Sequence, residues 1–243
     1  MPRNKKKILI FIVTYFASKK LLETYNLIPK KFIKKNNIKL LISDDNSKDN
    51  TISYAKQIYR KNKKNIFLKK NKKRLNYGGN IKSCLNFAQK SNYNYAIMLH
   101  GDGQYHPKYI PALINKMMKN DCSAIHGSRM KIKKSAIKGG MPLYKFFGNI
   151  ILTFFFNFIF STKFSDCHSG YWIYNLKYIR KNIYHHLTNG ISFDNQLRIS
   201  LVKRKLKILE IPIITIYKDE KKSFHLIYAI KFFFEVLINR FIK

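Results

Sequence analysis

The feature that most constrains the fold of this chain is a short apolar run that leads directly into a turn carrying a carboxylate. Residues 95–99 (YAIML) have the pattern of a buried strand, and residues 100–104 (HGDGQ) then place two glycines around Asp102. Pro107 suits the first turn of a following helix. Open α/β sheets bind ligands beyond the carboxyl ends of their strands. Asp102 is therefore a candidate metal or substrate ligand, although an Asp-Gly pair can also be only a tight turn.

The length and the apolar content indicate one α/β domain, or one domain with an appendage. The chain has 243 residues, and 46% of them are hydrophobic, which is enough for a sizeable core. Its three cysteines lie far apart with no Cys-x-x-Cys pair, a pattern that favours reduced, cytosolic thiols over a disulfide framework or a zinc site. We expect no signal peptide, because the basic start leads into an apolar run of only about seven residues.

The net charge of +36, from 48 Lys and Arg against 12 Asp and Glu, predicts anionic partners. Such a charge invites a nucleic-acid function. However, the lysine clusters (residues 5–7, 69–73 and 131–134) lie in predicted loops, not along one helix. We therefore expect no specific nucleic-acid partner. A basic surface favours nucleotides, lipid phosphates or the inner face of a membrane.

Two neighbouring strand ends carry further polar side chains. Residues 7–14 are expected to form a first buried strand that ends at Thr14, followed by a helix over roughly residues 18–35. Residues 39–44 are expected to form a second strand that runs into Asp44 and Asp45. The following segment, DDNSKDNT, holds more acidic and amide groups than the capping of one helix needs. We predict a ligand role for Asp44 or Asp45, because a carboxylate here can accept hydrogen bonds from a nucleobase or a ribose.

Two weaker signals concern the binding of anions. Gly78 and Gly79 precede an apolar helical face, and glycines at a helix N-terminus allow a close backbone approach to an anion. The chain contains no GxxxxGK[ST] sequence, so this is not a phosphate-binding loop of the Walker type. A strand at residues 123–126 ends in Gly-Ser-Arg. Arg129 there can clamp a phosphate through two parallel hydrogen bonds, or it can be an ordinary surface arginine.

Residues 142–160 and 224–243 are more apolar than the surface helices of a soluble domain need to be. The first would span about 28 Å, close to the hydrocarbon thickness of a bilayer. Each segment nevertheless contains a polar strip, which argues against a free membrane span. We expect both to lie at a membrane interface. The first could instead pack beneath an acceptor site or be an ordinary buried helix, and the second could contact a partner helix or a second copy of the chain. The strip of the first segment recurs every four residues: Lys145, Asn149, Thr153 and Asn157.

Six segments occur in an order and spacing that resemble the inverting family 2 glycosyltransferases, most closely the dolichyl-phosphate-mannose and polyprenyl-phosphate-glucose synthase-like group. They are DDNSKDNT, LNYGGNIKSCLNFA, LHGDGQYHP, GSR, HSGYWIYN and ISFDNQ, and the resemblance covers residues 8–219. It implies an α/β domain of the GT-A fold over residues 1–220, with a Rossmann-like, mostly parallel sheet flanked by helices. An amphipathic C-terminal helix over residues 221–243 would follow.

The resemblance also implies a nucleotide-sugar donor and a divalent cation, Mg²⁺ or Mn²⁺, on its diphosphate. The family's Asp-x-Asp motif falls on residues 100–102, so His100 replaces the first carboxylate. Asp102 and Gln104 match the remaining metal-ligand positions. The donor-binding residues are expected to be Thr14, Asp44, Asp45, Gly79 and Asp102.

On the acceptor side, Asp194 matches an acidic residue that lies near the acceptor in the family. Arg129 is expected to neutralise the diphosphate and, together with Ser169, to contact an acceptor phosphate. Asp102, Asp194 and Arg129 form the predicted catalytic set. Trp172 stands where related enzymes usually carry an arginine, so a phosphate contact there is missing or comes from another residue.

The expected reaction is inverting transfer of a sugar from a GDP- or UDP-linked donor to a polyprenyl (dolichyl-type) phosphate. The protein is expected to be cytoplasmic and peripheral at the inner face of the membrane. A phosphate acceptor is already an anion and needs no general base. An acceptor hydroxyl, as in surface-polysaccharide synthesis, would make Asp194 the base. A third alternative is a basic membrane- or nucleic-acid-binding protein with an inactive transferase fold. The sequence specifies neither the sugar nor the oligomeric state.

Overall fold

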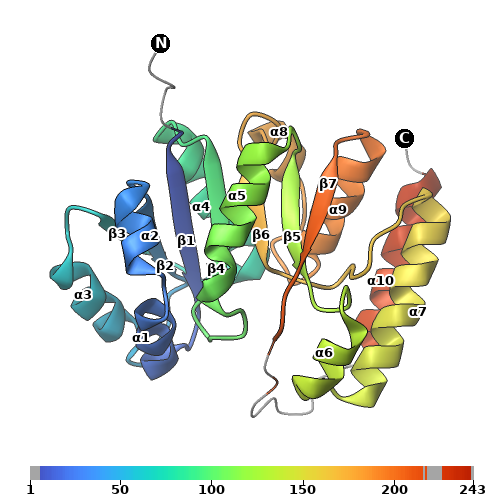
Figure 1. Cartoon of the computed structure of the whole chain (residues 1–243), viewed down its shortest axis with the longest axis horizontal. Helices are drawn as coiled ribbons and strands as arrows, with labels where there is room; N and C mark the ends of the chain where they lie inside the picture. Colours follow the sequence, from blue (N-terminus) through green and yellow to red (C-terminus); the bar gives the residue numbers. More distant parts are fainter. Residues whose placement is uncertain (1–5, 216, 218–225, 242–243) are drawn as a thin grey trace.

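A seven-stranded sheet forms the centre of the molecule (Figure 1). The structure is a computed structural model and describes residues 6–215, 217 and 226–241. The strand order is β3-β2-β1-β4-β6-β5-β7. β6 runs antiparallel to both of its neighbours, and the other pairs are parallel. The strands are β1 (Ile8–Thr14), β2 (Lys39–Asp44), β3 (Ile66–Lys70), β4 (Tyr95–His100), β5 (Ala124–Ser128), β6 (Trp172–Asn175) and β7 (Ile208–Pro212).

Helices cover both faces of the sheet, because alternate strand residues point to opposite sides. Ile10 and its neighbours on one face pack against helices α1, α3 and α5. Phe11 and its neighbours on the other face pack against α4, α8 and α9. This layering confirms the predicted α/β architecture. The helices are α1 (Ser18–Asn26), α2 (Lys30–Lys35), α3 (Thr51–Lys61), α4 (Asn76–Lys90), the 3₁₀ turn η1 (Pro107–Tyr109), α5 (Ile110–Lys119), α6 (Lys133–Lys138), α7 (Leu143–Phe160), α8 (Lys181–Tyr184), α9 (Phe193–Lys203) and α10 (Leu226–Phe241).

Two expectations about the helices were wrong. A single helix over residues 18–35 is replaced by α1 and α2, because Pro29 lacks the N–H that a continuous helix would need. Gly78 and Gly79 lie inside α4 and not before it. A Cβ atom on Gly78 would come within 2.5 Å of the Thr188 carbonyl oxygen. These glycines therefore allow α4 to pack closely against the loop that precedes α9.

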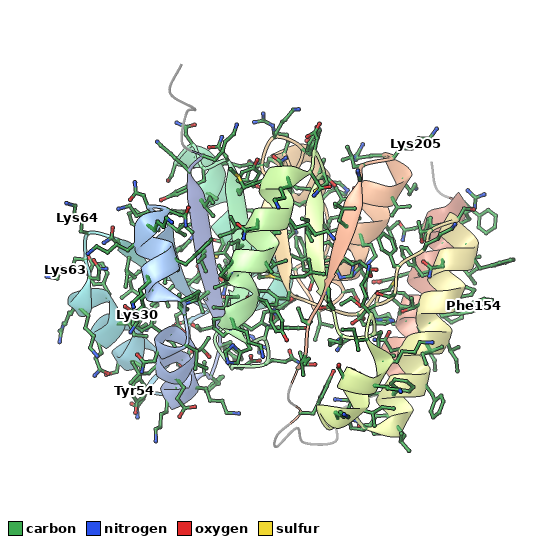
Figure 2. All side chains as sticks on the ribbon, in the orientation of Figure 1. Lys30, Tyr54, Lys63, Lys64, Phe154 and Lys205 are labelled. Carbon is green, nitrogen blue, oxygen red and sulfur yellow. The ribbon has the colours of Figure 1, made fainter. Side chains whose placement is uncertain are left out.

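Helices α7 and α10 lie side by side at one edge of the molecule (Figure 1), and a small separate core joins them to α9. The polar strip of α7 faces the interior: Asn149 and Thr153 are only 6% and 5% exposed. Phe154 and Phe158, on the opposite side of the same helix, are 71% and 75% exposed. Figure 2 shows Phe154 projecting away from the body of the protein. α7 thus presents its apolar side to the surroundings.

Of the helices that the structure describes, α7 is the one whose length and composition would allow it to cross a membrane. Its polar side is bound to the protein. The Asn149 side-chain amide donates to Asp166 Oδ1 at 3.0 Å, and the Thr153 hydroxyl donates to Asn149 Oδ1 at 3.1 Å. The expected C-terminal helix over residues 221–243 is described only for α10. There Phe232 and Val236 are buried against α7 and α9.

Candidate active site

Two cavities meet beyond the carboxyl ends of β1, β2 and β4. The smaller encloses about 210 Å³ and the larger about 450 Å³. Three residues line both of them: Tyr77 from α4, His100 at the end of β4, and Asp102 in the turn that follows. The turn predicted from the sequence therefore separates two adjoining binding spaces, and a group held in one can react with a group held in the other.

The smaller cavity includes Thr14 and Asp45 in its walls. Asp45 Oδ1 accepts hydrogen bonds from the Asn71 side-chain amide at 3.0 Å and from the Leu75 backbone N–H at 2.8 Å. Asp44, by contrast, is fully buried and lies outside the lining of both cavities. Its carboxylate accepts the Ser47 hydroxyl at 2.5 Å and the Ser47 backbone N–H at 3.1 Å. Asp44 thus shapes the loop, and Asp45 faces the cavity.

Arg74 is a cation in the wall of the smaller cavity that the sequence analysis did not single out. Its guanidinium lies 4.3 Å from the centre of the Tyr15 ring, which also lines this cavity. Gly79, which the sequence predicted to bind the donor, lines neither cavity. Its backbone N–H instead donates to the Asn189 carbonyl oxygen at 3.2 Å. Arg74, shortly before α4, thus brings a charged side chain to this cavity, and Gly79 does not reach it.

The turn after β4 is held tightly against β1. A Cβ atom on Gly101 would lie 2.5 Å from Thr14 Cγ2, so this position has no room for a side chain. The exposed Asp102 accepts the Gln104 backbone N–H on Oδ1 at 2.9 Å. Within the described ranges there is no cluster of three or more His, Cys, Asp and Glu side chains that could bind a metal ion. A cation beside Asp102 would therefore take several of its ligands from water or from a bound substrate.

A second carboxylate, Asp194, lines the larger cavity at the start of α9. The Tyr77 hydroxyl donates to Asp194 Oδ2 at 2.6 Å, and Asp194 Oδ1 is buried without a hydrogen-bond partner among the described residues. Burial raises the pKa of Asp194 to about 6, although the hydrogen bond from Tyr77 acts in the opposite direction. Near neutral pH this carboxylate can accept a proton from a group in the cavity.

Arg129 also lines the larger cavity, but it is already paired with a carboxylate that the sequence analysis did not identify. Its Nε and Nη2 donate to Asp166 Oδ2 and Oδ1 at 2.8 and 3.0 Å, and its Nη1 donates to the Tyr217 hydroxyl at 3.2 Å. The neighbouring guanidinium holds the pKa of Asp166 well below its usual range, against the effect of burial. Arg129 is thus fixed in place by Asp166 and adjoins only the larger of the two cavities.

The remaining predicted residues lie around the larger cavity. Gln104 lines it. Ser169 is buried between two lining residues, His168 and Gly170, and its hydroxyl has no hydrogen-bond partner among the described residues. Burial lowers the pKa of His168 to about 4, so its ring is neutral. Trp172 is fully buried in β6 and lines neither cavity. The side chain at this position therefore does not supply the contact that an arginine makes in related enzymes.

The mostly parallel sheet with two adjoining cavities at its carboxyl edge has the layout of a GT-A transferase. The chain belongs to glycosyl transferase family 2, whose family model matches residues 9–183. Two uncharacterized proteins of Methanocaldococcus jannaschii are similar over most of their length. MJ0544 is 28% identical over 201 residues, which are 80% of this chain and 83% of that protein. MJ1222 is 25% identical over 239 residues, which are 98% and 93% of the two chains.

Solved structures support the fold. A glucosyl-3-phosphoglycerate synthase from Mycobacterium tuberculosis, in complex with Mn²⁺, UDP and phosphoglyceric acid, has a TM-score of 0.67 at 11% identity, over 97% of this chain and 78% of that one. A mannosyltransferase from Pyrobaculum calidifontis, in complex with GDP-Man and Mn²⁺, has a TM-score of 0.63 at 9% identity, over 99% and 64%. The GT-A fold is thus confirmed, and the family makes the chain a nucleotide-sugar glycosyltransferase.

Proposed function

We propose that this chain transfers a sugar, with the aid of Mg²⁺ or Mn²⁺, from a UDP- or GDP-linked donor to a polyprenyl phosphate at a membrane surface. One observation carries the proposal. Leu152 of α7 and Ala229 and Phe232 of α10 line the larger cavity, and they belong to the helices that expose apolar faces. An acceptor with an anionic head and a hydrocarbon chain would meet both surfaces at once.

The smaller cavity is the proposed site of the nucleotide. The Asp45 carboxylate offers an acceptor for hydroxyl or amide groups of the nucleoside. Arg74 offers a guanidinium for the diphosphate, and such contacts to an anion are stronger than those between neutral groups. The sugar would then extend past His100 and Asp102 into the larger cavity, because these residues line both spaces.

Asp102 and Gln104 are the residues that would hold the cation. They fit a hard divalent ion, because the Asp102 carboxylate is exposed at the junction of the cavities and offers oxygen ligands. Mg²⁺ is usually bound through one or two carboxylates together with substrate phosphates. A single protein carboxylate is therefore compatible with this chemistry. When bound, the ion would neutralise charge on the diphosphate leaving group.

The acceptor phosphate is proposed to lie near Arg129, which faces the larger cavity and is held in position by Asp166. The Nη1 atom of Arg129 donates one N–H to the Tyr217 hydroxyl, and its second N–H is the donor proposed to contact the phosphate. A phosphate oxygen needs no deprotonation before it attacks the anomeric carbon from the face opposite the leaving group. The chain then acts mainly by positioning the two substrates and excluding water.

The surroundings of the larger cavity suit a membrane surface. The outward residues of α7 and α10 are aromatic or aliphatic, and the exposed cations Lys163, Lys231 and Arg240 flank them. Apolar side chains at the interface and cations on anionic headgroups are the two features that hold an interfacial helix. We propose peripheral binding and not a span, because the polar side of α7 bonds to the protein.

A vesicle assay with a matched control tests this proposal. The double variant Phe154→Ser/Phe158→Ser should lose binding to anionic vesicles and most transfer to polyprenyl phosphate, while it still binds the donor. Leu27→Ser removes another exposed apolar side chain, 52% exposed, just after α1 at the opposite edge of the molecule (Figure 1), and should change neither property. Equal vesicle binding by the double variant and the wild type would contradict the lipid acceptor.

A second acceptor class is favoured by one specific observation. Asp194 is a buried carboxylate with a raised pKa, it faces the larger cavity, and one of its oxygens lacks a partner among the described residues. These are the properties of a general base for a sugar hydroxyl. If the acceptor is a hydroxyl, Asp194→Asn should abolish transfer. If it is a lipid phosphate, transfer should persist, because no base is needed.

A further inference from the structure

His100 occupies the position of the first carboxylate in the family's Asp-x-Asp pattern, and neither the sequence nor the proposed reaction assigns it a role. Its ring lines both cavities and lies two residues before Asp102. Nε2 is 3.1 Å from the Gly170 carbonyl oxygen and 3.4 Å from the Tyr77 hydroxyl oxygen. These two contacts determine which ring nitrogen carries the proton.

A carbonyl oxygen can only accept a hydrogen bond, so Nε2 must donate to Gly170. The Tyr77 hydroxyl uses its single proton for Asp194 Oδ2 at 2.6 Å. Towards His100, therefore, Tyr77 also offers only lone pairs. Both neighbours favour the tautomer protonated at Nε2, and in the neutral ring this leaves a free lone pair on Nδ1.

We propose that His100 binds the divalent cation through Nδ1, beside Asp102, and that this ligand makes the site prefer Mn²⁺ to Mg²⁺. The inference rests on the proposed metal-assisted transfer and deepens it. Metal-binding histidines usually donate their other ring N–H to a backbone carbonyl or a carboxylate, which fixes the tautomer and orients the ring. The contact between His100 Nε2 and Gly170 supplies that support before any metal arrives.

The surroundings fix the ring as well as the proton. A Cβ atom on Gly170 would lie 3.0 Å from the Tyr77 hydroxyl oxygen and 3.2 Å from His100 Nε2, so the backbone approaches the ring closely. The Tyr105 ring packs edge-on against His100 with its centre 5.0 Å away. A ligand that is held in this way loses little conformational entropy when it binds an ion.

The choice of ion follows from the ligand. Mg²⁺ takes oxygen ligands in near-ideal octahedral geometry and gives up water reluctantly. Imidazole suits transition metals better, and Mn²⁺ also accepts the carboxylate and diphosphate oxygens of such a site. A nitrogen in place of the family's first carboxylate should therefore weaken Mg²⁺ binding more than Mn²⁺ binding.

Electron spin echo envelope modulation, which detects nitrogen bound to Mn²⁺, tests the proposal directly. Inorganic pyrophosphate serves as a nitrogen-free substitute for the donor diphosphate. Any ¹⁴N coupling then comes from the protein. The wild type should show it, and His100→Gln should lose it and bind Mn²⁺ at least about 10-fold more weakly. His106→Gln changes a histidine six positions along the chain, whose Nδ1 accepts the Lys108 backbone N–H, and should retain the coupling.

The outcomes separate this proposal from the proposed function. Coupling that is absent in the wild type, or that survives in His100→Gln, overturns the assignment of His100. If Mn²⁺ binding still depends on Asp102, as Asp102→Asn would reveal, the metal-assisted transfer stands. If binding depends on neither residue, the metal site itself is wrong.

A second variant, His100→Asp, keeps the proposal testable if His100→Gln fails to fold. His100→Asp restores the Asp-x-Asp pattern and should lower the ratio of Mn²⁺ to Mg²⁺ affinity about 10-fold or more. A folded His100→Asp protein with the wild-type ratio would contradict the predicted preference.

Discussion

Replacing Asp194 by Asn should make the protein more stable at neutral pH while it changes the chemistry of the larger cavity. Burial raises the pKa of this carboxyl from 3.8 to about 6. Each pKa unit corresponds to about 1.4 kcal/mol, so the ionised form lowers the free energy of unfolding by about 3 kcal/mol. The stabilisation of the protonated form is fully present below pH 3.8, and it is lost as the pH rises through about 6.

Asparagine cannot ionise, and its Oδ1 can still accept the Tyr77 hydroxyl. The stability of Asp194→Asn relative to the wild type should therefore rise by about 2.5 kcal/mol between about pH 4 and about pH 7.5, because a small part of the effect is already lost at the lower pH. Urea unfolding of both proteins at the two pH values measures this difference. Tyr77→Phe removes a hydrogen bond that favours the ionised form, so it should move the transition to higher pH. A difference in stability that does not change with pH would refute the reasoning.

Three other variants probe the two sides of the site. Asp45→Ala should weaken donor binding by about 1–3 kcal/mol in calorimetry, because Asp45 lines the smaller cavity. Asp44→Ala should mainly lower the free energy of unfolding, because the Asp44 carboxylate accepts a hydrogen bond from Ser47 in the loop and does not line the cavity. Asp166→Asn leaves the buried Arg129 without its counter-ion and should cost about 3–5 kcal/mol in urea unfolding. Because the pKa of Asp166 is lowered, its contribution should be present above pH 3.8 and lost as the pH falls, so a cost independent of pH would contradict the pairing.

The sequence predicted those parts of the site that lie at the ends of its own strands. Asp102 directly follows β4, Arg129 directly follows β5, and both reach the larger cavity. Such positions can be read from the sequence because a buried apolar run and the turn after it are adjacent in the chain.

The remaining features depend on contacts between distant segments, which periodicity does not reveal. The pairing of Arg129 with Asp166 joins residues 37 positions apart. The pattern of α7 defined a polar and an apolar side, but not which of them would face the protein. Tyr77 gave a signal only through its place before two glycines, and its role appears only once Asp194 lies beside it.

Metal-assisted transfer to a lipid phosphate is tested most directly by measuring sugar transfer from UDP- and GDP-linked donors to a polyprenyl phosphate in anionic vesicles. The wild type should transfer sugar with one of the donors when Mn²⁺ is present, and a chelator should stop the reaction. Asp102→Asn should keep its fold and lose most of this activity, because a charged ligand of the cation is gone. Transfer that is indifferent to the chelator, or that reaches only water-soluble hydroxyl acceptors, would contradict metal-assisted transfer to a lipid phosphate.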